Sequence, residues 1–352
     1  MEIVLTRNLK EGDILAADLM DAYDTILLKK GIELSKGHIL AIKSAGIYYV
    51  IVKSKNKVSS DSIKKLNAIK ETMINVIPGF FDAIFGEDSS KIEEELYIVD
   101  DMVKYIVETG EINTSIFDLK EYDDYTYVHC VNTSIMATFL GIQLNLKPEE
   151  LSSLALGAIL HDIGKMKLSI NILNKKEKLT IDEFNEIKNH TLNGELLLRN
   201  AGIKDKIVLD IVLQHHERID GNGYPYGISG DEISIFAKIV SICDVFTALS
   251  ANRSYRDRFN PNDAYEFILT KYNIMFDSYM VNTFKETFAI YPRGCKIRLS
   301  NGIEGSIISQ NKGFPDRPII KVYYDGGLKR AVKNYDLNLL DYINLTIVET
   351  LK

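Results

Sequence analysis

Five of the six histidines in the chain fall between residues 129 and 216, where they form an ordered series with two aspartates. Histidine is the commonest transition-metal ligand, and carboxylates commonly bridge two ions or balance their charge. Seven such groups exceed the needs of one tetrahedral ion but suit two ions that share a carboxylate. Two ions held close together can activate a water molecule that attacks a phosphodiester. The series therefore predicts a binuclear metal site built from His129, His161, Asp162, His190, His215, His216 and Asp244.

The donor types indicate which ions to expect. Cys130 follows His129 and Cys243 precedes Asp244, but neighbours on a helix point about 100° apart. We therefore interpret both cysteines as small buried hydrophobes. Structural zinc sites favour cysteine and four ligands, whereas a nitrogen and oxygen set with excess ligands suits iron or manganese. We expect two divalent ions, non-haem iron or alternatively manganese, with positions open for water and substrate.

Helical periodicity dominates residues 111–289, which must position these side chains. The pattern predicts helices within residues 125–144, 148–165, 180–202, 204–219 and 234–251. The adjacent pairs, His161-Asp162 and His215-His216, fall at predicted helix ends. The two side chains of each pair should point in different directions. Each pair can therefore bind two different ions, or bind one ion and also supply a bridging ligand. His38 lies far from the series and is predicted to be a solvated or capping residue.

The fold class expected for the whole chain is mainly α, an all-helical metal-binding bundle with a small domain on each side. Residues 1–55 read as a small mixed α/β domain and 56–110 as a helical connector that breaks at Pro78-Gly79. Residues 290–352 alternate polar and apolar side chains, with turn signals at Asn301-Gly302 and at Asp325, which predicts a small β-rich module. The connector carries an apolar stripe that forms either a dimer seam or a contact with the adjacent domain: Ile69, Met73, Val76, Ile77, Phe80, Phe81 and Ile84.

Composition excludes several classes of protein. A chain of 352 residues with 46% hydrophobic side chains is long enough for two or three folded domains. Its net charge of −7 argues against broad nucleic-acid binding. The N-terminus has no signal-peptide pattern, and the apolar segment 234–251 is interrupted by Lys238 and Asp244, so no membrane span is expected. Three cysteines without a CxxC pair suit a reducing compartment, which predicts a cytoplasmic protein.

Longer strings around the ligand series resemble a known family. The string HDIGK at 161–165, with a histidine about thirty residues to either side, is typical of the HD phosphohydrolase superfamily. The chain closely resembles the HD-GYP family from residue 120 to about 285. The strings that carry this resemblance are YTYVH at 125–129, NHTLNG at 189–194, HHERIDGNGYP at 215–225 and CDVFTALSANRSYR at 243–256.

This resemblance assigns roles to the ligands. In HD-GYP proteins the aspartate of the HD pair bridges two metals, so Asp162 takes that role and the other six groups are terminal ligands. Some members bind a third metal through a glutamate one helical turn before the first histidine. Tyr125 occupies that place here, which predicts two ions rather than three. Asp123 is expected to orient His129 from outside the ligand set.

The resemblance also implies an activity. HD-GYP proteins open cyclic di-GMP to linear pGpG, and sometimes on to GMP; two ions about 3.5–4 Å apart can hold a bridging hydroxide for in-line attack. Asp162 and Lys165 are the implied catalytic residues. Lys165 also binds phosphate, with the pair Arg253 and Arg256, while Tyr224 lines a guanine pocket at the mouth of the site. Lys165 as a solvated helix-end charge and Tyr224 as a turn-packing aromatic remain alternatives.

Two other functions remain open at this point. The first is hydrolysis of another cyclic dinucleotide such as cyclic GMP-AMP, and the second is a receptor that binds cyclic di-GMP without cutting it. Thr247 departs from the family, which often has a second aspartate three residues after the last ligand, and this change can slow turnover or alter nucleotide preference. Homodimerisation, and signalling-protein partners at the loop around Gly223-Tyr224-Pro225 (the GYP loop), are further predictions.

Overall fold

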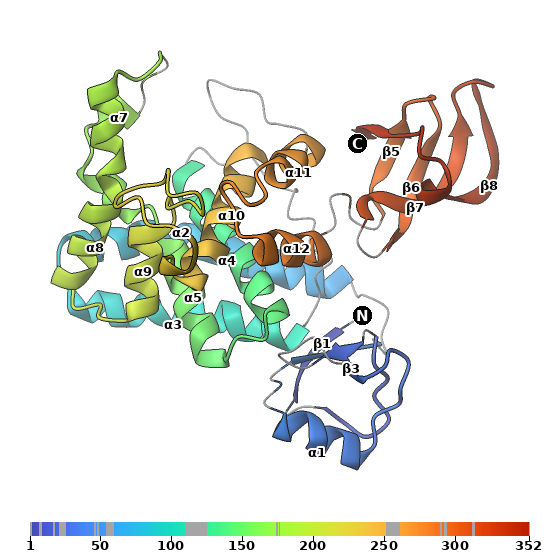
Figure 1. Ribbon diagram of the computed structural model, residues 1–352, viewed down its shortest axis with the longest axis horizontal. Helices are drawn as coiled ribbons and strands as arrows, with labels where there is room; N and C mark the ends of the chain where they lie inside the picture. Colours follow the sequence, from blue (N-terminus) through green and yellow to red (C-terminus); the bar gives the residue numbers. More distant parts are fainter. Residues whose placement is uncertain are drawn as a thin grey trace.

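The fold of the chain is given by a computed structural model (Figure 1). It describes residues 2–6, 9–16, 18–20, 26–45, 47, 49–53, 60–109, 125–173, 175, 177–250, 261–288, 291, 294–311 and 314–351. Helices dominate its centre, and an antiparallel sheet follows them near the C-terminus, so the mainly α prediction with a small C-terminal sheet is confirmed. The domain boundaries at 55, 110 and 289 stay predictions.

The central helices pack around α4, which is buried on nearly every side from Val128 to Ile142. A helix that is apolar all round belongs inside a core, and α4 packs against α5 and α10. The helices of this part are α4 (Tyr125–Gln143), α5 (Pro148–Leu160), α6 (Ile170–Leu173), α7 (Ile181–Lys188), α8 (His190–Asn200), α9 (Lys206–Gln214), α10 (Ile235–Ser250), α11 (Pro261–Thr270) and α12 (Ser278–Thr287), with 3-10 turns η2 (Ile163–Lys167) and η3 (Gly230–Glu232).

The predicted break at Pro78-Gly79 is wrong. Helix α2 (Ser60–Phe85) continues through Pro78, and the chain turns instead at Gly86 and Glu87 before α3 (Ser89–Thr109). An internal proline costs a helix about 3 kcal/mol. Burial of one large apolar side chain stabilises by about 1.5–3 kcal/mol, and five side chains of α2 are fully buried, so packing outweighs the lost hydrogen bond. These five are Met73, Ile77, Phe80, Phe81 and Ile84.

The apolar stripe of α2 is therefore used within the chain. Its buried members belong to the same core as α3 and α4, and α2 contacts both helices. This is the second of the two predicted roles, a contact with the adjacent domain. A dimer seam at the same side chains would require the core to open.

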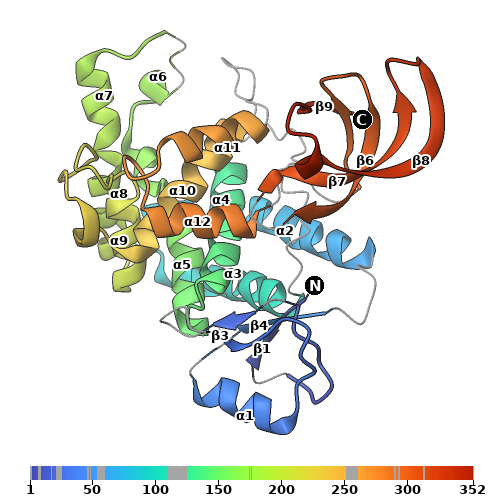
Figure 2. The same ribbon diagram turned by 45° about the vertical axis from the view of Figure 1, so that its right-hand side comes forward.

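The C-terminal sheet has the strand order β8-β7-β6-β5-β9, and every neighbouring pair is antiparallel. Both predicted turns lie between its strands: Gly302 has a φ of 81°, and the Asp325 carboxylate accepts hydrogen bonds from the amides of Gly327 and Leu328. Its buried side chains belong to the same core as those of the helices. Strand β7 contacts helix α12, and Figure 2 shows the sheet beside that helix. The strands are β5 (Lys296–Leu299), β6 (Glu304–Asn311), β7 (Phe314–Asp325), β8 (Arg330–Asn338) and β9 (Ile347–Leu351), with a 3-10 turn η4 (Leu339–Asp341) after β8.

The N-terminal part has a separate small core around Leu15, Leu34 and Ile42. Strand β1 (Glu2–Leu5) pairs with β4 (Tyr49–Val52), β2 (Leu19–Met20) pairs with β3 (Ile26–Leu28), and α1 (Lys36–Ser44) lies between β3 and β4 in sequence. His38 caps α1: its amide donates to Ser35 Oγ, and its Nδ1 accepts from the Ser35 amide, as expected of a capping histidine. No helix within the described ranges combines the length and apolar character needed to cross a membrane.

Candidate metal centre

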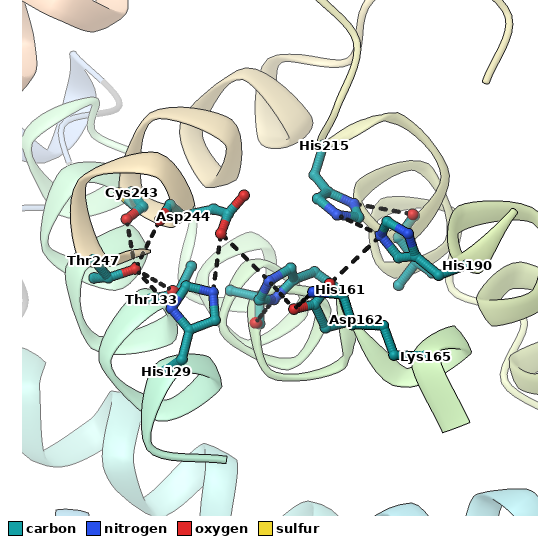
Figure 3. A network of polar contacts seen from close by, with 12 residues as sticks. His129, Thr133, His161, Asp162, Lys165, His190, His215, Cys243, Asp244 and Thr247 are labelled. Atoms are coloured by element: carbon teal, nitrogen blue, oxygen red, sulfur yellow. Dashed lines mark hydrogen bonds and ion pairs between the residues drawn. The ribbon is translucent and has the colours of Figure 1, made fainter. Parts of the chain in front are cut away.

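The predicted ligands come from separate helices and meet at one place in the bundle (Figure 3). Helix α4 carries His129 and α10 carries Asp244, both within the helix. The other ligands stand at helix ends, where they follow α5, begin α8 or follow α9: His161, Asp162, His190, His215 and His216. All but His216, which is half-buried, are buried.

The seven side chains divide into two adjoining groups. Asp162, His190, His215 and His216 form the first group, and His129, His161 and Asp244 form the second; within each group, one donor atom per residue lies within 4.8 Å of the others. The neighbours His215 and His216 share a group, with ring centres 4.1 Å apart, whereas His161 and Asp162 are divided between the two. Two groups of donors fit two ions.

Asp162 faces both groups. Its Oδ2 lies 3.4 Å from Nε2 of His161, and its Oδ1 lies 3.5 Å from Nε2 of His190. Lys165 Nζ donates to Oδ2 at 2.5 Å. Burial by itself raises the pKa of the Asp162 carboxyl, but Lys165, His161 and His190 outweigh burial and hold this pKa well below its usual range. Asp162 is therefore a carboxylate with one oxygen turned toward each group.

The ring orientation of three ligands is fixed by backbone carbonyls. Nδ1 of His161 lies 2.7 Å from the carbonyl oxygen of Ala158, and Nδ1 of His190 lies 2.7 Å from that of Ile187. His215 Nδ1 lies 3.1 Å from the carbonyl oxygen of Ile211. A carbonyl oxygen only accepts, so each Nδ1 carries the proton and each neutral ring has its free lone pair on Nε2. These three Nε2 atoms are ready to bind metal.

Thr247 orients the fourth ring, His129. Its hydroxyl lies within 2.9 Å and 3.0 Å of two backbone carbonyl oxygens of its own helix, which take its proton. Thr247 Oγ1 therefore accepts from Thr133 Oγ1 at 2.8 Å and from Nδ1 of His129 at 3.1 Å. The sequence marked Thr247 as a departure from the family but gave no sign of this contact or of Thr133.

Several electron-rich atoms face one another without a proton between them. Nε2 of His190 and Nε2 of His215 lie 3.3 Å apart, and both rings carry their proton on Nδ1. Nε2 of His161 and Oδ1 of Asp162 are buried and make no hydrogen bond to any described residue. Buried acceptors without donors are costly, and cations between them remove the repulsion. The donor set therefore fits divalent metal ions.

Protons should compete with the metal mainly at the His161 ring. Burial lowers the pKa of the other four histidines, that of His216 to about 3, so protons compete with the metal less at these four rings. Burial also opposes protonation of His161, but Asp162 and Asp244 outweigh it and raise its pKa. Metal affinity should be constant above that pKa and fall about tenfold per pH unit below it. Competition with a chelator between pH 8 and 5 measures this slope.

The matched control for this titration is His38→Gln, because His38 caps α1 and lies outside the ligand set. It should reproduce the wild-type slope. If metal affinity does not change with pH, imidazole ligation is contradicted. If affinity falls by more than about tenfold per pH unit, more than one proton competes and the assignment to one histidine is contradicted.

Two structural features fix the GYP loop beside the ligand groups. The buried Glu217 carboxylate accepts hydrogen bonds from the amides of Tyr226 and Gly227 at 2.8 and 3.2 Å and so folds the GYP loop back on itself. A β-carbon on Gly223 would overlap the backbone of Glu217. The Tyr224 ring consequently packs on the His216 ring, with centres 4.7 Å apart and planes at 31°. Sequence reasoning missed Glu217, although its position directly after the histidine pair was a signal.

The remaining predicted residues are distributed as follows. Lys165 lies on η2, its side chain is 32% exposed, and it contacts Asp162, so it is not a solvated helix-end charge. Tyr125 begins α4, but its side chain lies outside the described residues. Asp123, Arg253 and Arg256 also lie outside them.

Comparison with known proteins places the centre in context. Residues 119–278 match the family model described as HD domain. The chain is 33% identical over 266 residues to a cyclic di-GMP phosphodiesterase of Pseudomonas aeruginosa, an alignment that covers 75% of this chain and 63% of that protein. It is 37% identical over 145 residues to the cyclic di-GMP phosphodiesterase response regulator RpfG of Xanthomonas campestris, covering 41% and 38%.

Another relative is a 3'3'-cGAMP-specific phosphodiesterase of Vibrio cholerae, 36% identical over 132 residues, or 38% of this chain and 28% of that protein. The chain thus spans less than two thirds of these curated relatives. Among solved structures, an HDG"Y"P protein from Bdellovibrio bacteriovorus aligns with a TM-score of 0.55 and 15% identity, over 80% of this chain and 97% of that one. This structural likeness concerns the fold.

Proposed function

We propose that this chain, which matches an HD domain over residues 119–278 and resembles the HD-GYP family, is a metal-dependent phosphodiesterase of cyclic di-GMP. The observation that carries the proposal is the pair of adjoining ligand groups with Asp162 turned toward both. Curated relatives named as cyclic di-GMP phosphodiesterases support the choice of substrate. The expected product is linear pGpG, with GMP as a further product.

Each side chain of the centre has a role in this reaction. Two divalent ions bound here would supply an activated water and stabilise charge on the phosphodiester. Asp162 would contact both ions, and the other six groups would each hold one of them. Lys165 lies next to the bridge, where its ammonium can bind a phosphate oxygen. Tyr224 lies against His216 and forms one wall of the entrance.

The ions that fit this donor set best are non-haem iron and, as an alternative, manganese. The two groups together offer five imidazoles and two carboxylates and no thiolate. Such nitrogen and oxygen sets with open positions suit these ions, whereas structural zinc sites are usually tetrahedral and rich in cysteine.

A second candidate substrate is cyclic GMP-AMP. It is favoured by the relatives named as 3'3'-cGAMP-specific phosphodiesterases, which are 31–36% identical to this chain. Both nucleotides share the cyclic sugar-phosphate ring and differ in one base. A receptor that does not cut is less well supported, because all seven ligand positions are filled.

The proposal is tested by product analysis on a panel of cyclic di-GMP, cyclic GMP-AMP and cyclic di-AMP. The protein is purified without oxygen and loaded with iron or manganese. We expect wild type to convert cyclic di-GMP to pGpG fastest. Lys165→Ala should keep its metal but lose roughly 10- to 150-fold in kcat/KM, the range for one hydrogen bond to a charged group.

Lys167→Ala is the control, since Lys167 is exposed on the same 3-10 turn and should leave the rate unchanged. Preferred cleavage of cyclic GMP-AMP would replace the proposed substrate by the second candidate. Two bound ions without turnover of any nucleotide would instead indicate a receptor.

A further inference from the structure

Helix α7 projects from the helical body beside α8 (Figures 1 and 2), and α8 begins at the ligand His190. It carries Phe184, a residue that is 46% exposed, and it ends at Lys188, two residues before the ligand His190. An exposed ring this close to a reaction centre is a candidate for ligand contact, because flat aromatic faces are what nucleobases stack on.

A cation joins this ring to the site. Lys188 lies one turn after Phe184, with its Nζ 4.7 Å from the Phe184 ring centre and 5.8 Å from that of Tyr224. Tyr224 in turn packs on the metal ligand His216. No carboxylate in the described ranges forms an ion pair with Lys188. Phe184, Lys188 and Tyr224 therefore form a continuous row, called here the α7 row, that leads from the metal ligands outward.

The α7 row is held in place although α7 is short. An isolated helix of eight residues is marginal in water. Here Thr180 caps the helix by accepting from the amide of Glu183, and the Glu183 carboxylate accepts from the Thr180 amide. Lys175 Nζ donates to both oxygens of Glu183, at 2.6 and 2.7 Å. These contacts fix the start of α7, so Phe184 is presented on an ordered helix.

The chemistry of the row matches half of a cyclic dinucleotide. Such a ligand has two phosphodiesters and two purines on one ring, and the phosphodiester that is cut must lie at the metals. Its other phosphate and one purine then extend away from the ions. The Lys188 ammonium beside two aromatic rings offers a contact for an anion and a surface for stacking, next to the metal ligands.

We infer that Phe184 stacks on a purine of the substrate and that Lys188 binds the phosphate that is not cut. This inference rests on the proposed function and assigns the recognition of the substrate's second half to α7. Neither residue takes part in the bond cleavage, so their loss should weaken binding of the nucleotide and leave the chemistry of a small phosphodiester untouched.

The test compares kcat and KM for cyclic di-GMP and for methyl 4-nitrophenyl phosphate, a small phosphodiester without a purine. For Phe184→Ala we expect KM for cyclic di-GMP to rise roughly 5- to 150-fold, the range for one stacked base, with little change in kcat. Lys188→Gln should raise the same KM. Phe184→Tyr should have a KM for cyclic di-GMP close to that of wild type. Phe184→Ala and Lys188→Gln should cleave the small substrate at the wild-type rate.

Ile181→Ala is the matched control, because Ile181 is 81% exposed at the far end of the same helix and outside the α7 row. Its kinetics should equal those of wild type. Unchanged KM for cyclic di-GMP in both α7 variants, or an equal loss on both substrates, overturns the assignment of α7. Wild type that cleaves only the small substrate overturns the proposed function itself.

Discussion

Replacing Asp162 by asparagine should lower the rate of cyclic dinucleotide hydrolysis by at least about 10³-fold, beyond the 10- to 100-fold typical of groups that only support a ligand. Asparagine keeps the shape of the side chain but removes its charge and one acceptor oxygen. The two oxygens of Asp162 face different ligand groups, so the asparagine variant can no longer offer a carboxylate oxygen to each group. Bound metal per chain should fall with the rate.

Metal content and turnover are measured on the same preparation, so loss of ions is separated from loss of chemistry. Asp210→Asn is the control: its carboxylate pairs with Lys206 on the surface of α9, away from the ligand set. It should behave as wild type. An Asp162→Asn enzyme with two ions and an unchanged rate would remove the bridging role.

Replacing Gly164 by alanine should destabilise the fold by at least about 3 kcal/mol, at the upper end of overpacking. A β-carbon at this position would overlap the carbonyl oxygen of His190 and lie 2.5 Å from the amide nitrogen of Gly194. These are backbone atoms, so no rotamer change relieves the contact. Turn η2 and helix α8 would have to separate, which displaces Asp162 and His190 together. Thermal unfolding measures the loss.

Gly79→Ala provides the contrast. Gly79 lies inside α2, and a β-carbon there meets nothing within 4 Å. Alanine should leave the stability unchanged or raise it by roughly 0.5–1 kcal/mol, because it favours helix more than glycine does. Gly164→Ala as stable as Gly79→Ala would show that the close approach of η2 to α8 is not required.

The ligand set was predictable because its signal lies in residue identity and order. A histidine or aspartate at each of seven positions needs only helices of roughly the right length to meet, and apolar periodicity indicated those helices. The β-rich C-terminal region was likewise evident, since alternation and the turns at Asn301-Gly302 and Asp325 are local features. The sequence also indicated that Cys130 and Cys243 are buried beside ligands without joining them.

Other features depend on contacts that no local pattern records. The helix through Pro78 forms because its apolar face is buried by α3 and α4, and propensity alone favours a break there. The hydroxyl pair Thr133 and Thr247 joins residues 114 positions apart. The fold of the GYP loop depends on a single buried carboxylate, Glu217, whose partners become neighbours only after the loop closes.

The carbonyls that fix the ligand rings also shape the electrostatic field of the centre. Ala158, Ile187 and Ile211 lie in the last turns of α5, α7 and α9, so three helix C-termini converge on the ligand histidines. Each brings roughly half a negative elementary charge from its dipole, in addition to the two carboxylates. Before metal enters, the centre attracts cations and repels phosphate. Metal loading should reverse the local potential, so we expect the cations to bind before the nucleotide.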